Sequence, residues 1–173
     1  MAVIGAEESF AQTACGACER LGARVAIAGA AVAEEAEVDA QISSACAQLG
    51  EVDMLLLDGA GAFAAGGLSA CLDVAWNATR ALVDNCFLPA ARAGRIVYLA
   101  PAPDAGEGAE GARAGLENLA RTLSIEWARH RITLVTIAPD TGASQQALAA
   151  LIAYLASPAG AYFSGCQLQM RRT

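Results

Sequence analysis

The sequence predicts an α/β protein in which a doubly wound parallel sheet of about six strands carries helices on both faces. Short apolar runs alternate with helix-length segments along the whole chain, which is the pattern of parallel strands connected by helices. The run at residues 53–57 is almost wholly apolar, as expected of a strand that is buried on both faces. Neither an internal repeat nor a linker interrupts the 173 residues, so we expect one domain.

The amino-terminal half predicts three strands and two helices. A short strand precedes a helix that stops at Gly22, because glycine ends the helical pattern. A second strand is followed by an acidic stretch and by a helix that ends near Leu49 and Gly50. We place the strands at residues 2–5, 24–29 and 53–57, and the first helix at residues 8–21.

The carboxy-terminal half continues the alternation. A Gly- and Ala-rich segment at residues 58–67 predicts a loop. The fifth strand is closed by Ala138 and Pro139. We expect the helices at residues 68–92, 111–127 and 144–156, and the strands at residues 95–99, 133–137 and 167–170.

The charge composition limits the classes of partner. All 11 basic residues are arginine, against 18 Asp and Glu, which gives a net charge of -7. This balance disfavours nucleic acid and anionic membranes, because no basic patch exists to neutralise phosphates. No segment is apolar enough to span a bilayer, and the first residues lack the plan of a signal peptide, so we expect a cytoplasmic protein.

The apolar composition points to assembly. Hydrophobic residues make up 55% of the chain and charged residues 17%. So few charges cover a surface thinly, which favours burial of one or more faces against other subunits. An alanine-rich monomer is the alternative, since much of the apolar count is Ala.

The six cysteines are interpreted as reduced, small, buried side chains rather than as a disulfide framework. Cys15 and Cys18 form a CxxC pair inside a predicted helix. A structural zinc site needs four ligands, and a redox pair normally caps a helix start. We therefore favour a packing role for this pair and expect no metal site.

Six segments in order along the chain resemble the short-chain dehydrogenase/reductase superfamily. They lie at residues 53–56, 94–97, 114–119, 132–139, 154–159 and 162–165. The resemblance implies a truncated Rossmann-like sheet in a single domain over residues 1–173. Between Gly29 and Val52 there is room for one helix, where the family has an additional strand and helix. One strand-helix unit is therefore expected to be missing after about residue 30.

The resemblance places the family's dinucleotide turn, Gly-x-x-x-Gly-x-Gly, at Gly5, Ser9 and Ala11. Two of the three glycines are replaced, and Glu7 and Glu8 add negative charge to the turn. A pyrophosphate would meet side chains and like charge in place of bare amides. We expect no cofactor to be bound by this chain.

The family's catalytic positions are also replaced. The serine position falls at Ala100 or Pro101, the tyrosine position at Ala109 and the lysine position at Arg113. Because the acid–base groups are missing together, the resemblance implies no catalytic residue in this chain. Arg113 is also similar to the arginine of the halohydrin dehalogenases, but that branch needs the tyrosine and the serine as well.

The resemblance implies that the surviving function is assembly, through the helices at residues 68–92 and 111–127 and the last helix and strand. We expect a catalytically inactive subunit that forms a hetero-oligomer, such as a heterotetramer, with an active short-chain dehydrogenase paralogue that binds NAD. The degeneration is similar in kind to that of the inactive subunit in a heteromeric dehydrogenase of anaerobic toluene degradation, whose active partner oxidises a hydroxyacyl-CoA. The candidate interface residues are Trp76, Phe87, Leu116, Leu119, Leu123, Trp127, Leu168 and Met170.

Two alternatives stay open. The chain could be a self-standing enzyme with a non-standard site, or a regulatory subunit that binds a small molecule. Asp58 is the leading candidate for a new site, because it ends a strand at the edge where ligands bind in such sheets. The other candidates are Tyr98, His130, Asp140 and Tyr162.

Overall fold

The fold is built on one six-stranded, all-parallel sheet, as the sequence predicts. The computed structural model describes residues 1–4, 10–29 and 34–171. The strand order is β2-β1-β3-β4-β5-β6. The strands are β1 (Ala2–Ile4), β2 (Ala26–Ala28), β3 (Met54–Asp58), β4 (Gly94–Leu99), β5 (Ile132–Pro139) and β6 (Cys166–Met170).

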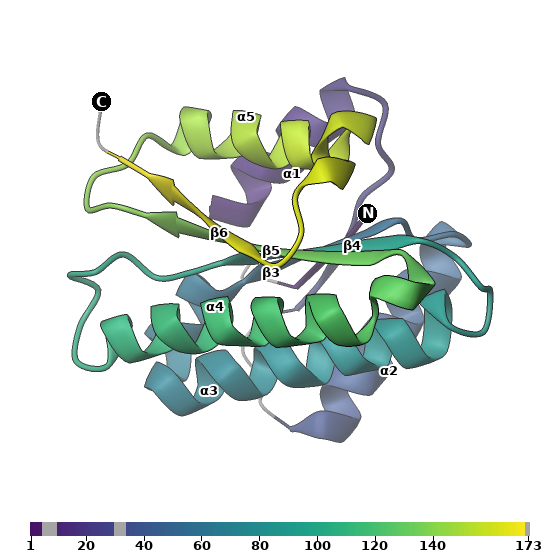
Figure 1. Ribbon diagram of the computed structural model, residues 1–173, viewed down its shortest axis with the longest axis horizontal. Coiled ribbons are helices and arrows are strands. Elements are labelled where there is room, and N and C mark those ends of the chain that lie inside the picture. Colours follow the sequence, from purple (N-terminus) through teal and green to yellow (C-terminus); the bar gives the residue numbers. More distant parts are fainter. Residues whose placement is uncertain (5–9, 30–33, 172–173) are drawn as a thin grey trace.

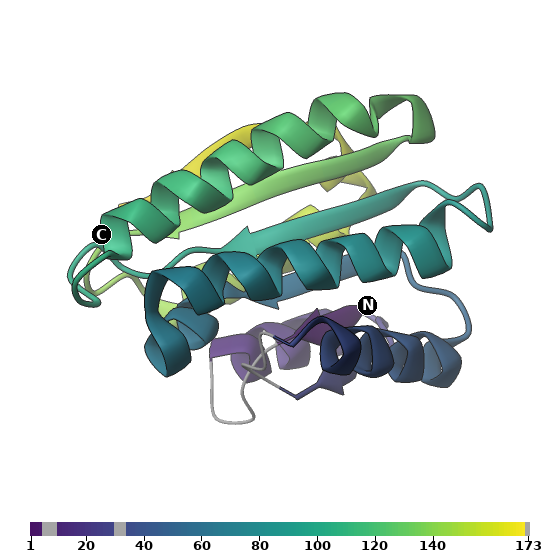
Figure 2. The same cartoon turned by 90° about the horizontal axis from the view of Figure 1, so that it is seen from below.

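Helices cover both faces of this sheet (Figure 1). The helices α1 (Phe10–Arg20) and α5 (Gln145–Ala156) lie on one face. On the other face α2 (Glu35–Leu49), α3 (Gly59–Leu82) and α4 (Ala109–Glu126) lie side by side (Figure 2). Each face has its own apolar core. Among the described residues, none of the helices is both long and apolar enough to cross a membrane.

Two buried hydrogen bonds tie the second helix layer to the sheet. Tyr98 and Thr136 are register partners on β4 and β5. The Tyr98 hydroxyl shares a hydrogen bond of 2.7 Å with Thr79 of α3. The Thr136 hydroxyl donates to the backbone carbonyl of Leu116 in α4 at 3.1 Å. The polar atoms inside this core are thus paired, as burial requires.

The prediction of a loop at residues 58–67 is wrong, because α3 already begins at Gly59. The carboxylate of Asp58 caps the helix by accepting from the Gly61 N–H at 2.9 Å. The glycines predict a loop, but only Gly66 and Gly67 leave the helical conformation. They produce a kink inside α3, and the helix begins before them.

The carboxyl end of this element is also different from the prediction. The expected helix over residues 68–92 ends as an α-helix at Leu82 and continues as a π-helical segment, η1 (Val83–Phe87). Residues 88–91 form turns before β4. The π-helical turn brings Cys86 toward the end of α2.

The interpretation of all six cysteines as reduced is wrong for one pair. Cys46 of α2 and Cys86 of η1 form a disulfide. The two residues are 40 positions apart in the sequence, and only the packing of α2 beside α3 brings them together. Spacing along the chain contains no signal for such a contact.

Candidate functional site

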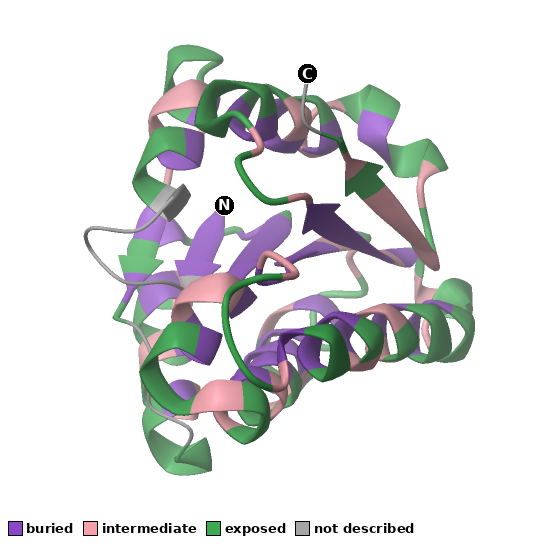
Figure 3. Cartoon of the chain, turned by 90° about the vertical axis from the view of Figure 1, so that its left-hand side faces the viewer, coloured by how far each residue is buried: buried purple, intermediate pink, exposed green. Residues whose placement is uncertain are grey.

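The carboxyl edge of the sheet holds the positions at which the sequence predicts a degenerate catalytic site. Figure 3 views the molecule from the carboxyl ends of the strands. The ends of β3, β4 and β5 meet the start of α4 here, as expected of a parallel sheet. Asp58, Ala100 and Pro139 lie at or just beyond these strand ends, and all three are buried.

Arg113 occupies this edge as a buried cation. Its side chain is 8% exposed, and Nη1 donates to the backbone carbonyls of Pro101 at 2.7 Å and Pro139 at 2.9 Å. The Nε atom lies 3.8 Å from a carboxylate oxygen of Glu110, whose side chain is 74% exposed. Arg113 therefore joins the segments that follow β4 and end β5, and its donors point at carbonyls of the chain itself.

The local sequence explains this placement. Gly108, at a φ of 85°, turns the chain into α4. Ala109 and Ala112 then face the core, with exposed fractions of 1% and 0%. Arg113 follows on the same inner face one turn after Ala109, because residues four apart lie above one another on a helix. The guanidinium is thus directed to the sheet edge.

The two other positions that the sequence predicts for the family's catalytic residues carry only methyl groups. Ala100 is fully buried beyond β4, and its N–H donates to the carbonyl of Ile137 at 2.9 Å. Ala109 is buried in the first turn of α4. Neither side chain can donate or accept a proton. The structure brings Ala100, Ala109 and Arg113 to one edge of the sheet.

Asp58 serves as a helix cap. Asp58 is 3% exposed, and its carboxylate accepts a hydrogen bond from the Gly61 N–H. A Cβ on Gly59 would lie 2.8 Å from the carbonyl oxygen of Leu99, so glycine is needed here for close packing of α3 against β4. Gly59 therefore has a structural reason that involves no ligand.

The remaining candidates for a new site do not meet. Tyr98 lies in the core, and burial raises the pKa of its phenol. Tyr162 is 94% exposed. His130 accepts from the Nε atom of Arg129 at 2.9 Å. Asp140 accepts from the side-chain amide of Gln169, also at 2.9 Å.

A shallow crevice of about 280 Å³ lies beside Arg113. Its charged lining residues besides Arg113 are Glu110, Glu117 and Asp140, so carboxylates outnumber the one guanidinium. An anionic dinucleotide would meet like charge here, and Arg113 is already engaged with carbonyls.

The predicted cofactor turn cannot be placed in the same way. Gly5 and Ser9 lie outside the described residues, and Ala11 falls in the first turn of α1 with its side chain undescribed.

The CxxC pair is packed inside α1. Cys15 is 4% exposed and Cys18 is 1% exposed, and both belong to the core under α1 and α5. Burial raises the pKa of the Cys15 thiol to about 11, and it raises the pKa of Cys18 as well. A thiol that stays protonated is a poor nucleophile and a poor metal ligand. In the described parts of the chain, no group of three or more His, Cys, Asp or Glu side chains is placed to hold a metal ion.

The candidate interface residues divide into two groups. Phe87, Leu116 and Leu123 are at most 3% exposed and pack inside the chain, so they belong to the part of the apolar stripe that faces the sheet. Trp76 is 43% exposed on α3. The partly buried members are Leu119, Trp127, Leu168 and Met170.

Two further apolar side chains, outside the list of candidate interface residues, are exposed on the same helix layer. Leu68 of α3 is 40% exposed and Ile125 of α4 is 76% exposed. Together with Trp76 we call them the α3–α4 face. Leu68 and Trp76 are two helical turns apart, so their spacing could have identified them as one stripe.

Solved structures show what this fold is similar to. The chain matches a 3-ketoacyl-(acyl-carrier-protein) reductase from Brucella melitensis, complexed with NADH, at 19% identity and a TM-score of 0.81, covering 98% of this chain and 95% of that one. It matches a short-chain dehydrogenase/reductase from Serratia marcescens at 17% identity and a TM-score of 0.79, over 98% and 94% of the two chains. A hydroxysteroid dehydrogenase from Escherichia coli matches at 16% identity and a TM-score of 0.79, over 97% and 93%.

By sequence, the chain matches no protein-family model and no curated protein. The structural matches extend over nearly the whole chain at low identity. The chain therefore has the Rossmann-like fold of the short-chain dehydrogenases/reductases.

Proposed function

We propose that this chain is a catalytically inactive subunit that assembles with an active, NAD-dependent short-chain dehydrogenase paralogue and supports alcohol oxidation by the complex. The observation that carries the proposal is the bonding of the Arg113 side chain to the chain's own backbone. Arg113 stands where the fold's catalytic lysine would stand, and its guanidinium is held by the carbonyls of Pro101 and Pro139. Ala109 and Ala100 supply no hydroxyl beside it.

Loss of these groups together would remove the chemistry of an alcohol dehydrogenase. An acid–base group contributes about 10²–10⁴ in rate, and here the tyrosine, the serine and the lysine are all replaced. The carboxylates around the crevice further oppose a dinucleotide. NAD is accordingly assigned to the partner subunit, with a hydroxyacyl-CoA as the proposed class of substrate.

The α3–α4 face supports the assembly part of the proposal. α3 and α4 pack closely: a Cβ on Gly115 would lie 2.7 Å from a methyl carbon of Leu72. The two helices therefore present one rigid surface, and Leu68, Trp76 and Ile125 are exposed on it. Tryptophan is a favoured anchor at interfaces. We propose that this face contacts the active paralogue in a hetero-oligomer, and we propose a tetramer.

The truncation is part of the same proposal. The short strand β2 is an edge of the sheet, and α2 connects it directly to β3. We infer that a single domain has lost one strand-helix unit after about residue 30, on the side of the sheet opposite β6.

Two measurements test inactivity. The isolated chain is expected to give no turnover of alcohols or ketones with NAD(H) or NADP(H), and no thermal shift with these dinucleotides. A ligand present at about 100 times its dissociation constant would stabilise the chain by about 2.7 kcal/mol, which a thermal-shift assay detects. Turnover by the purified chain would overturn the proposal in favour of a self-standing enzyme.

A matched pair of variants tests the assembly surface. Trp76→Arg combined with Ile125→Arg places two charges on the α3–α4 face and is expected to abolish copurification with the active paralogue. Leu21→Arg is the control, because Leu21 is 74% exposed and follows α1 on the opposite helix layer. Equal copurification of the wild type and the double variant would contradict the assignment of this face.

The crevice beside Arg113 favours one alternative, a regulatory subunit that binds a small molecule. Its acidic lining would disfavour phosphorylated ligands. A thermal shift with an uncharged or cationic metabolite, and none with NAD, NADP or acyl-CoA compounds, would support this alternative.

A further inference from the structure

We propose that the Cys46–Cys86 disulfide is a thiol–disulfide exchange site that reacts with low-molecular-weight thiols and serves as a reversible covalent tether for the end of α2. Cys46 lies in the last turn of α2, and Cys86 lies in the π-helical segment η1. The tether therefore joins two elements that the sequence separates by a strand and a long helix.

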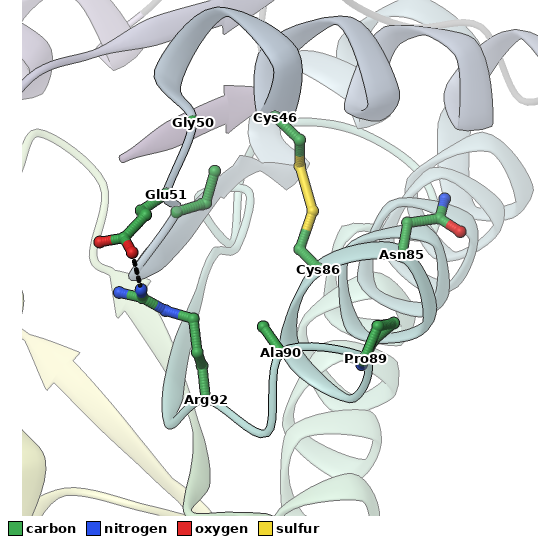
Figure 4. Close-up of a pocket in the computed structure, with 9 residues that line it drawn as sticks. Cys46, Gly50, Glu51, Asn85, Cys86, Pro89, Ala90 and Arg92 are labelled. Atoms are coloured by element: carbon green, nitrogen blue, oxygen red, sulfur yellow. Dashed lines mark ion pairs between the residues drawn. A yellow bond between two sulfur atoms is a disulfide. The ribbon is translucent and has the colours of Figure 1, made fainter.

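The disulfide can be reached from solvent. Both cysteines are only partly buried, and both line a surface pocket of about 530 Å³ (Figure 4). Pro89 and Ala90 form part of its wall, and Arg92 lies in it with its guanidinium 2.7 Å from a carboxylate oxygen of Glu51. A pocket of this volume admits a small thiol, since ligand pockets span about 300–1,000 Å³. An attacking sulfur can thus approach the bond without unfolding the chain.

Three of the four free cysteines lack this access. Cys15, Cys18 and Cys71 are at most 4% exposed. Burial raises the pKa of Cys71 to about 12 and that of Cys15 to about 11, so their thiols stay protonated near neutral pH. Thiol chemistry near neutral pH should therefore spare these three cysteines in the folded chain.

Other contacts also hold α2, so loss of the tether need not unfold the chain. At the start of α2 the Nη2 atom of Arg80 lies 2.8 Å from Glu35 and 2.9 Å from Asp39. At its end Arg24 donates to the carbonyl of Leu49 at 2.6 Å. Reduction is therefore expected to loosen the last turn of α2 and the connection at Gly50 while the sheet remains folded.

The exchange balances in two steps. A small thiolate attacks one sulfur of the disulfide, which forms a mixed disulfide and releases the other cysteine as a thiolate. A second small thiolate attacks the mixed disulfide, which releases the first cysteine as a thiolate. Two small thiols are thereby oxidised to their disulfide, and Cys46 and Cys86 are reduced to thiols after proton uptake.

The test uses the folded, full-length chain purified without reductant. The chain is incubated with millimolar glutathione, quenched with iodoacetamide and analysed by peptide mass spectrometry. We expect Cys46 and Cys86 to be linked before the incubation, and alkylated or glutathionylated after it. Cys15, Cys18 and Cys71 should stay unmodified until denaturant is added. Alkylation of Cys46 and Cys86 without glutathione, or resistance of the disulfide until the chain is unfolded, would overturn the proposal.

A thermal measurement tests the tether separately. A disulfide that closes a loop of this size should raise the melting temperature, so reduction is expected to lower it by about 5–10 °C. The Cys86→Ser variant should lose this response to reductant. Cys166→Ser is the matched control, because Cys166 is a free, partly buried cysteine and its variant should respond as the wild type does. If reduction lowers the melting temperature of Cys86→Ser as much as that of the wild type, the disulfide is not a tether. If Cys86→Ser does not fold, the alkylation pattern of the wild type tests the proposal instead.

Discussion

At the scale of single residues, Arg113 decides how the carboxyl edge of the sheet is used. A lysine at this position would carry one ammonium group, whereas the guanidinium has several donors in a fixed plane. Here one nitrogen of that plane, Nη1, donates to two backbone carbonyls, those of Pro101 and Pro139. The arginine consequently holds together the edge at which a dehydrogenase would hold its substrate.

Replacement of Arg113 should therefore destabilise the chain. Arg113→Met leaves two carbonyls without their donor, and we expect the free energy of unfolding to fall by about 3 kcal/mol, as for hydrogen bonds to charged groups. Arg113→Lys should cost less, because an ammonium can still reach one carbonyl. Urea denaturation measures both. Arg121→Met is the control: its side chain is 61% exposed and paired with Glu117, and we expect a loss of less than about 1 kcal/mol. Equal losses for Arg113→Met and the control would contradict a clamping role.

Tyr98 is predicted to act through its buried hydrogen bond and not through chemistry. Tyr98→Phe leaves the Thr79 hydroxyl without its partner in the core. The free energy of unfolding should fall by about 1–2 kcal/mol in urea denaturation. Tyr162→Phe is the matched control, because Tyr162 is 94% exposed and should change stability by less than about 0.5 kcal/mol.

Alkaline pH should destabilise the fold. Burial raises the pKa of Cys15 to about 11 and that of Cys71 to about 12, from an ordinary value of 9.0. Between the ordinary and the raised pKa the unfolded chain loses these protons while the folded chain keeps them, so the folded state loses stability as pH rises. We expect the free energy of unfolding to decline from about pH 9 upward. A series of urea titrations between pH 7 and pH 11 measures this decline, and a flat profile would contradict it.

At the scale of elements, the strands are the part that the sequence predicts best. Buried parallel strands are short apolar runs, and Met54–Asp58 with its neighbours on the sheet follows that rule. Helix bounds depend on contacts that local patterns do not contain. The start of α3 at Gly59 depends on the cap by Asp58, and the disulfide depends on how α2 lies beside η1. The positions Ala100, Ala109 and Arg113 are predicted from alignment on family motifs, whereas the partners of Arg113 are backbone carbonyls, which carry no signal in the side-chain sequence.

Two glycines with different surroundings give a prediction at this scale. A Cβ on Gly94 would overlap the ring of Phe87, which joins the start of β4 to η1. Gly94→Ala should lower the free energy of unfolding by about 2–3 kcal/mol, as for an overpacked core. Gly16 lies inside α1, where a Cβ would lie 3.5 Å from the flexible end of Arg20. Gly16→Ala should instead raise stability by up to about 1 kcal/mol. Chemical denaturation of the two variants in parallel tests the opposite signs.

At the scale of the whole molecule, the chain has the fold of the short-chain dehydrogenases/reductases. The six-stranded parallel sheet and both helix layers are complete enough to match solved dehydrogenases over nearly the whole chain. The buried side chains at the carboxyl edge serve packing and clamping. The apolar side chains of the α3–α4 face are exposed in the isolated chain. Assembly with a partner would bury them, which is why assembly is the function we propose.

The most direct test of this proposal is native mass spectrometry of the tagged chain purified from the organism that encodes it, combined with an NAD-dependent alcohol oxidation assay of the same sample. We expect a complex of fixed stoichiometry that contains an active short-chain dehydrogenase paralogue, with activity that requires the partner's catalytic tyrosine and lysine. A stable homo-oligomer of this chain that oxidises the alcohol alone would contradict the proposal.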